Sequence, residues 1–234
     1  MFATRSQKLE RIDTGDYTPE EYDRFLSDIQ LVNRFAGDNR ALRRTLLREV
    51  RETDLKAFSV LDVGAGSGQL LKLIARRARR EQRVARLVGL ELNARSAYLI
   101  HEGSEDFPEI RSVRGDALKM PFADRSFDYA VSSLFAHHLK DEEIVAALHE
   151  MSRVSRRGVF LIDLHRHPMA LVAYKAFCTA FAISRLVRED GSLSILRGFK
   201  RPELADLARK AGFENFKVIR STPFRLVLCA EPKD

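Results

Sequence analysis

The sequence has few cysteines and no long uninterrupted hydrophobic run. Its two cysteines, Cys178 and Cys229, lie far apart, which excludes a disulfide framework and offers no metal-ligand spacing. Such cysteine usage is typical of a reducing environment, so we predict a cytoplasmic protein. The first ten residues lack the apolar core of a signal peptide. The most apolar stretch, residues 169–183, contains Lys175 and is too short to cross a bilayer, and no membrane span is expected.

The chain also carries little excess charge of either sign. It has 40 basic and 33 acidic side chains in 234 residues, which gives a net charge of +7. An excess of this size permits a nucleic-acid partner but does not indicate one. The basic stretch at residues 75–86 covers a predicted helix end, where positive charge suits the helix dipole. We interpret it as a solvated helix end, with RNA binding as the alternative.

Short apolar runs alternate with helical segments from residue 57 onward. This alternation is typical of a parallel, doubly wound sheet with helices on both faces. The last two runs are joined by so few residues that they can pair only antiparallel. We therefore expect a mostly parallel sheet with one antiparallel C-terminal strand at its edge. The seven predicted strands cover residues 58–63, 85–92, 109–116, 126–133, 157–164, 214–220 and 224–231.

Two further helical regions accompany this sheet. Residues 1–56 read as an N-terminal helical extension, and residues 57–234 as the main domain. Within the main domain, residues 165–200 are mostly apolar and helical, which is long for a connection. We predict that they form an inserted lid or substrate wall.

The stretch "VLDVGAGSGQLL" (residues 60–71) combines a buried strand with a glycine-rich loop. Glycines at alternate positions allow backbone N–H groups to approach a ligand without an intervening Cβ. A dinucleotide fold would space the glycines G-x-G-x-x-G, and a nucleoside triphosphatase would need a lysine and a hydroxyl residue after the last glycine. Gln69 and Leu70 stand there instead. Asp62, placed before the first glycine, would repel a pyrophosphate and suits a cation.

Two more acids stand at the ends of successive predicted strands. Glu91 ends the second strand, where a carboxylate can accept two ribose hydroxyls. Asp116 follows the third strand, where it can accept a hydrogen bond from an amino group such as that of adenine. Together with Asp62, they suit a positively charged nucleoside without a phosphate. A nicotinamide or flavin dinucleotide is the alternative, because Glu91 would serve it too.

Several motifs resemble those of class I S-adenosylmethionine-dependent methyltransferases. They are "VLDVGAGSG", "LVGLELN", "GDALKMPFADRSFDYAVSS", the following "HHL" and the helix–"AGF"–hairpin ending. The resemblance covers residues 57–164 and 200–231 and implies a Rossmann-like seven-stranded fold. It implies S-adenosyl-L-methionine as cofactor and S-adenosyl-L-homocysteine as product. Its implied cofactor-binding residues are Asp62, Gly64, Ala65, Gly66, Gly68, Glu91, Leu92, Asp116, Ala117 and Ser133.

The chemistry of the acceptor is less defined by the sequence. Methylation of a hydroxyl is helped by a general base, usually histidine. His137 and His138 follow the fourth strand, and His165 follows the fifth. All three are candidate bases, and Asp163 could orient a neighbouring imidazole. No acid or cysteine cluster accompanies these histidines in sequence, so no metal is expected.

Macromolecular methyltransferases are disfavoured because their motifs are missing. The segment after the fourth strand reads "SSLF", without the Pro-Pro-aromatic motif of amino-methylating nucleic-acid enzymes, and no cysteine lies near it. The predicted lid is rich in apolar side chains, and its Tyr174, Phe177 and Arg197 are candidate substrate contacts.

"IDLHRHPMA" and "VREDGSLSILRGFKRPEL" resemble enzymes associated with polyketide and quinone-type natural products. We expect a small, aromatic or polyketide/quinone-type acceptor. Methylation on oxygen is favoured, and methylation on carbon is the next alternative. An RNA or protein methyltransferase, or a non-catalytic cofactor-binding module, remains the alternative. A homodimer formed through exposed apolar helices is also considered.

Overall fold

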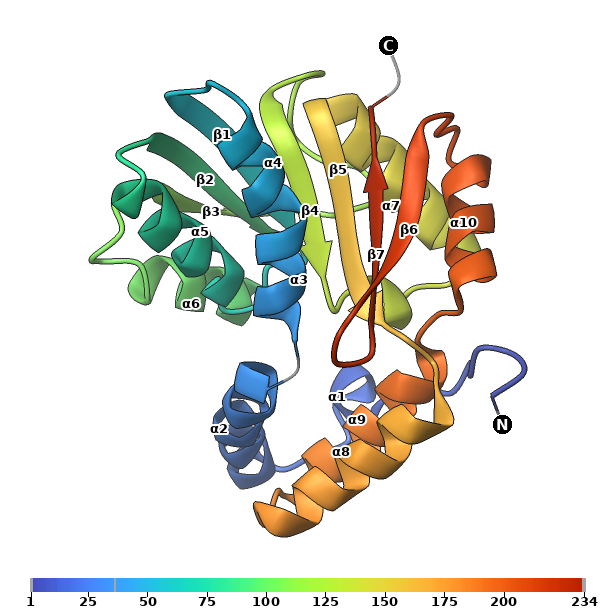
Figure 1. Ribbon diagram of the computed structural model, residues 1–234. Coiled ribbons are helices and arrows are strands. Elements are labelled where there is room, and N and C mark those ends of the chain that lie inside the picture. Colours follow the sequence, from blue (N-terminus) through green and yellow to red (C-terminus); the bar gives the residue numbers. More distant parts are fainter. Residues whose placement is uncertain (1, 36, 233–234) are drawn as a thin grey trace.

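A computed structural model describes residues 2–35 and 37–232, and its centre is one seven-stranded sheet (Figure 1). The strand order is β3-β2-β1-β4-β5-β7-β6, which is the Rossmann-like order with the switch point between β1 and β4. The strands are β1 (Ala57–Val63), β2 (Val84–Glu91), β3 (Ile110–Arg114), β4 (Phe127–Ser133), β5 (Ser155–Leu164), β6 (Phe216–Ser221) and β7 (Arg225–Ala230).

The antiparallel strand is β7, and it does not lie at the edge where we expected it. It pairs antiparallel with both β5 and β6, so β6 becomes the edge strand. Every residue of β7 is buried, whereas β6 alternates between buried and more exposed positions. The continuous apolar run "LVLCA" (residues 226–230) suits a strand covered on both faces, and the polar Lys217 and Arg220 of β6 suit an edge.

Helices cover both faces of the sheet and form two hydrophobic cores. One core joins the sheet to α7 and α10, and the other joins it to α3, α4, α5 and α6. Figure 1 shows these two layers on opposite sides of the strands. The helices are α3 (Asp38–Arg44), α4 (Leu46–Glu52), α5 (Gln69–Arg80), α6 (Ala94–Glu102), α7 (Asp141–Val154) and α10 (Arg201–Lys210).

The basic end of α5 is partly neutralised by acids of its own surroundings. Arg77 pairs with Glu81 at 2.5 Å and Arg79 pairs with Glu109 at 2.7 Å. Arg83 donates to the backbone carbonyls of Val50, Thr53 and Leu55. These contacts support the interpretation of residues 75–86 as a solvated helix end.

A second group of helices, here named the cap, lies across the carboxyl ends of the strands (Figure 1). It consists of α1 (Arg11–Thr14), α2 (Pro19–Phe35), α8 (Pro168–Ala180) and α9 (Arg185–Arg197). Apolar side chains of α2 pack against Cys178, Ile183 and Val187. The region predicted as a single extension, residues 1–56, is thus divided. Its first two helices join the cap and the next two pack on the sheet.

The residues that precede α1 run along α9 and tie the cap together. The backbone N–H of Ser6 donates to the carbonyl of Leu196 (3.0 Å). The buried carboxylate of Asp190 accepts the backbone N–H groups of Arg11 and Ile12, both at 2.9 Å. Within the described ranges, none of the helices combines the length and hydrophobicity needed to cross a membrane.

Candidate functional site

The glycine loop (residues 64–68) leaves β1 at the carboxyl edge of the sheet and enters α5. Gly64, Gly66 and Gly68 all have positive φ, at +70°, +54° and +72°. A Cβ on Gly64 would lie 2.5 Å from the ring of Phe135, whereas a Cβ on Gly66 would meet nothing within 4 Å. The backbone N–H groups of Gly64 and Ala65 donate to Leu90 of β2. There is therefore open space beside the Cα of Gly66, on a loop whose first residues are anchored to β2.

Asp62 lies directly beneath this loop and is 2% exposed. Burial, together with the negative charge of Glu91, raises its pKa to about 8. Within the described chain, neither a hydrogen bond nor a cation compensates for the burial of this carboxyl group. A carboxylate in this position gains most from a positively charged ligand.

Glu91 ends β2 and faces the same loop. Its Oε2 accepts the backbone N–H of Gly66 at 2.9 Å, and its Oε1 lies 3.3 Å from the backbone nitrogen of Asn93. Leu92, the next residue, is 64% exposed. The structure thus brings the predicted cofactor residues of the first two strands to one place.

The remaining predicted cofactor residues follow β3 and β4. Asp116 is exposed, and its Oδ1 accepts the backbone N–H of Leu118 at 2.8 Å. Ala117 beside it is 8% exposed and packs into the core. Ser133 is the half-buried last residue of β4, and Leu134 after it has a positive φ of +54°. Each of these residues therefore lies at or beside a strand end on the carboxyl edge.

A partly buried group of polar side chains, here named the histidine cluster, lies between the sheet and the cap. It comprises Glu10, Asp13, His137, His138 and Asp163. The two histidines form the short 3-10 helix η1 (Ala136–His138) after β4, and their ring centroids are 4.2 Å apart. Asp163 lies near the end of β5, and the two other acids come from the segment around α1.

Each histidine of the cluster is held by a carboxylate. Nδ1 of His137 lies 2.8 Å from Oδ1 of Asp163, and its backbone N–H donates to Oδ2 of the same residue. Nδ1 of His138 lies 3.0 Å from Oδ1 of Asp13. Because an ionised carboxylate can only accept a hydrogen bond, Nδ1 of each ring carries the proton and donates it. In the neutral ring, Nε2 is then left as the acceptor.

Burial and charge oppose each other in this cluster. Burial raises the pKa of Glu10. Burial would also raise the pKa of Asp163, but His137 and two backbone N–H donors hold it below its ordinary value. Burial would lower the pKa of His138, but Asp13 and Glu10 outweigh burial and raise it. The cluster therefore favours the ionised form of Asp163 and shifts the titration of His138 to higher pH.

Arg197, predicted as a substrate contact, occupies a different position. Its guanidinium donates to the carbonyls of His137 (2.8 Å), His138 (2.7 Å) and Lys8 (2.6 Å), and the residue is 4% exposed. These contacts join α9, η1 and the N-terminal segment. They give Arg197 a structural task, and they offer no support for a direct contact with substrate.

The other predicted residues are spread over the cap. Tyr174 donates its hydroxyl to the carbonyl of Val187 (2.6 Å) between α8 and α9. The ring of Phe177 lies against that of the half-exposed Phe181 in a tilted arrangement, with centroids 4.5 Å apart. His165 lies away from the cluster, its backbone N–H bonded to Phe224 in the β6–β7 hairpin and its ring 5.5 Å from that of His167.

Sequence reasoning missed Glu10 and Asp13, because they lie more than 120 residues from His138. Only the path of the N-terminal segment along α9 brings them to the histidines. No motif or spacing in the sequence signals this contact. Asp163 is the one carboxylate of the cluster that the sequence indicated as a partner for an imidazole, because it lies beside a predicted strand end.

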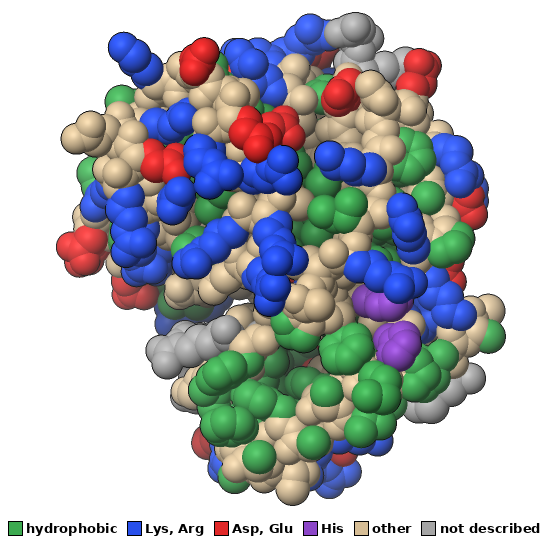
Figure 2. All heavy atoms as spheres, in the orientation of Figure 1, with side chains coloured by type: hydrophobic (Ala, Val, Ile, Leu, Met, Phe, Trp, Pro, Cys, Tyr) green, Lys and Arg blue, Asp and Glu red, His purple; other side chains and the backbone are tan. Residues whose placement is uncertain are grey.

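Surface features add a contrast between the cap and the rest of the molecule. Figure 2 shows hydrophobic side chains gathered over the cap, with Lys and Arg spread over the body above it. Large apolar side chains at least half exposed in this region are Phe35, Met169, Val172 and Phe181.

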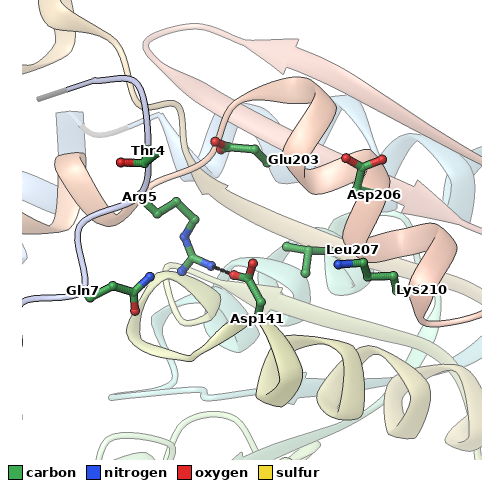
Figure 3. Close-up of a pocket in the computed structure, with 8 residues that line it drawn as sticks. All are labelled: Thr4, Arg5, Gln7, Asp141, Glu203, Asp206, Leu207 and Lys210. Atoms are coloured by element: carbon green, nitrogen blue, oxygen red, sulfur yellow. Dashed lines mark hydrogen bonds and ion pairs between the residues drawn. The ribbon is translucent and has the colours of Figure 1, made fainter.

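A hollow of about 310 Å³ lies elsewhere, among Arg5, Asp141 and residues of α10 (Figure 3). Arg5 points at Asp141 across it and pairs with it at 2.5 Å, so its lining is already internally compensated.

Comparison with known proteins gives consistent relatives. A family model described as a methyltransferase domain matches residues 60–158. A 2-phytyl-1,4-naphtoquinone methyltransferase of Thermosynechococcus vestitus is 29% identical over 170 residues, which are 68% of this chain and 73% of the relative. A demethylmenaquinone methyltransferase of Staphylococcus carnosus is 28% identical over 144 residues, 56% of this chain and 59% of the relative.

Solved structures add evidence about the fold. The magnesium protoporphyrin IX methyltransferase of Synechocystis PCC 6803, solved with bound SAH, matches with a TM-score of 0.64. The match covers 96% of this chain and 100% of that one at 14% identity. At this identity the similarity establishes the fold alone, and it extends over the cap as well as the sheet.

Proposed function

Since the chain belongs to the class I S-adenosylmethionine-dependent methyltransferases, we propose that its small-molecule acceptor is a quinone in its reduced form, methylated on a ring carbon. The observation that carries this proposal is the joint occurrence of the buried Asp62 carboxyl group, which has no partner at the glycine loop, and an apolar cap. The names of the two relatives, which refer to naphthoquinone and menaquinone substrates, favour carbon over oxygen.

The residues at the glycine loop fit the cofactor. A buried carboxyl group with a raised pKa matches an amino group that carries positive charge. The open space around Gly66 leaves room for an amino-acid moiety against the backbone. We assign Asp62 and the glycine loop to that moiety, Glu91 to the ribose hydroxyls, and Asp116 with Ala117 to the adenine. Ser133 would line the same cleft from β4. Bound S-adenosylmethionine supplies a methyl group on a sulfonium centre.

The acceptor chemistry needs a group that removes a proton. A hydroquinone that loses a hydroxyl proton gains electron density at the neighbouring ring carbon. With S-adenosylmethionine bound, that carbon would form the new bond to the methyl group while the C–S electron pair stays on sulfur. The ring carbon would then release its proton to solvent and the hydroxyl oxygen would regain one from the base that took it, so that one proton is released overall. His138 can accept the hydroxyl proton at Nε2 while Asp13 holds its Nδ1 proton. Loss of the hydroxyl proton is common to carbon and oxygen methylation.

The cap provides the environment for such an acceptor. Its apolar side chains can exclude water from the carboxyl edge and contact an aromatic ring. Phe177 and Tyr174 lie on α8, one of the helices of the cap. Within the cap, we assign the role of a lid to residues 165–200.

The proposal is tested by an anaerobic assay with chemically reduced 2-phytyl-1,4-naphthoquinone and demethylated menaquinone. Mass spectrometry would show the added methyl group, and proton NMR would separate a ring methyl from a methoxy group. We expect a ring methyl with the wild type and no product with Asp62→Asn. A methoxy product would restore oxygen as the acceptor atom. No product from any quinol, with cofactor binding intact, would refute a quinone acceptor.

A further inference from the structure

The histidine cluster contains a set of atoms suited to hold a metal ion. One ligand atom each from Glu10, His137 and His138 lies within 4.8 Å of the others. Ligands bound to a tetrahedral Zn²⁺ at about 2.0–2.1 Å are on the order of 3.4 Å apart. A small inward movement of the three side chains would therefore complete such a site.

The two imidazoles are already oriented in the way that metal ligands are. Asp163 holds Nδ1 of His137 at 2.8 Å, and Asp13 holds Nδ1 of His138 at 3.0 Å. Metal-ligating histidines almost always donate their second ring N–H to a carboxylate or carbonyl, which fixes the tautomer and raises the basicity of the ligating nitrogen. Both histidines meet this condition independently of each other.

The charge of the cluster also matches a divalent cation. Its three carboxylates face one guanidinium, that of Arg197, which lies 3.9 Å from Glu10 and 3.8 Å from Asp13. The nearby Arg5 is neutralised by its partner Asp141. With neutral imidazoles, the cluster therefore has two negative charges more than positive ones. Buried charge of this size requires compensation.

Glu10 is the least compensated of these carboxylates. It is 3% exposed, and its hydrogen bond comes from the hydroxyl of Ser194 at 2.9 Å. Arg197 approaches it only to 3.9 Å, and each of the three guanidinium nitrogens donates to a backbone carbonyl instead. An oxygen of Glu10 thus remains available on the side of the histidines.

We propose that Glu10, His137 and His138 form a binding site for one divalent first-row transition metal ion, with Zn²⁺ as its preferred occupant. Two imidazoles and one carboxylate suit such ions and disfavour Mg²⁺ and Ca²⁺. Three protein ligands leave one coordination position open, as in catalytic rather than structural zinc sites. If the acceptor is a hydroquinone, its hydroxyl could bind at this position and would release its proton to water, in place of the transfer to His138.

The test uses Co²⁺ as a spectroscopic substitute, on the full chain without a histidine tag and after treatment with a chelator. Binding of Co²⁺ needs neither cofactor nor acceptor, so its result is separate from that of the quinone assay. We expect one ion per chain, with visible absorption bands of a four-coordinate site. Glu10→Gln and His138→Gln are expected to weaken binding by at least about 100-fold, and Asp13→Asn by about 10- to 100-fold.

The control is the other close histidine pair of the described chain, His165 and His167. The double variant His165→Gln/His167→Gln should bind Co²⁺ like the wild type. Loss of binding in this variant, or wild-type affinity in Glu10→Gln and Asp13→Asn, would overturn the proposal. So would the absence of a four-coordinate spectrum in the wild type. Asp13 is partly exposed, so Asp13→Asn keeps the test valid if Glu10→Gln fails to fold.

Discussion

The glycine loop and the histidine cluster lie at the same edge of the sheet but are built in opposite ways. The loop takes its functional groups from a short continuous stretch plus Glu91, and it leaves the Asp62 carboxyl group buried without a partner. The cluster gathers residues from the N-terminal segment, η1 and β5, and every histidine in it has a carboxylate partner. One region is therefore incomplete without a ligand, and the other is held together by internal contacts that fix its geometry.

Replacement of Asp62 by Asn should produce the largest difference between the two regions. We expect cofactor affinity to fall by about 1,000-fold, because the bound amino group would lose a buried charge partner. Unfolding free energy should rise at the same time. The raised pKa means that Asp62 stabilises the fold below about pH 4 and loses this stability as pH rises through about 8.

Calorimetry with S-adenosylhomocysteine and chemical denaturation at pH 6 and pH 9 would measure both effects. Asp62→Asn should be more stable than the wild type, and more so at the higher pH. Unchanged affinity would remove Asp62 from the cofactor site. If Asp62→Asn were less stable than the wild type at pH 9, this would contradict the uncompensated burial of the Asp62 carboxyl group.

The loop itself can be examined with a matched pair of substitutions, Gly64→Ala and Gly66→Ala. Both positions have positive φ, which costs about 1–2 kcal/mol for an L-residue. Only Gly64→Ala adds a contact of 2.5 Å with the ring of Phe135. We expect its total cost to reach about 3 kcal/mol, measured by urea denaturation. Equal losses in the two variants would show that Phe135 moves aside freely.

On the cluster side, Arg197→Lys should reduce stability by about 2 kcal/mol, because the single ammonium nitrogen of lysine cannot reach all the carbonyls that the three guanidinium nitrogens contact. The matched control is Arg185→Lys on the same helix, whose side chain is 83% exposed, and it should cause no measurable change. The acceptor KM should be unaffected by Arg197→Lys. A raised KM with unchanged stability would restore the substrate contact predicted from the sequence.

A further expected effect, seen without any substitution, is the pH dependence of cofactor binding. The carboxyl group of Asp62 must ionise to pair with the bound amino group, and its pKa in the free protein is about 8. Affinity should therefore rise with pH between about 6 and 8, by up to about tenfold per unit, and level off above. Calorimetry in two buffers of different ionisation enthalpy would detect the released proton. A flat profile in the wild type would show that Asp62 is already ionised before the ligand binds.

Local sequence determined the sheet, the glycine loop and the cofactor class. The strand–helix alternation gave the parallel sheet, because buried strands and amphipathic helices differ in the period of their apolar residues. Asp62, Glu91 and Asp116 could be assigned together, because parallel strands end at one edge. The position of β7 inside the sheet was also encoded in its continuous apolar run, although we expected it at the edge.

Only the tertiary structure determined the histidine cluster and the role of Arg197. Glu10 and Asp13 reach His138 because the N-terminal segment is fixed along α9 by backbone hydrogen bonds and Asp190. Such contacts depend on where a long connection packs, and no local period or spacing records that. The sequence thus specified where the cofactor binds, whereas the packing of the cap determined which acids surround the histidines that we assign to the acceptor.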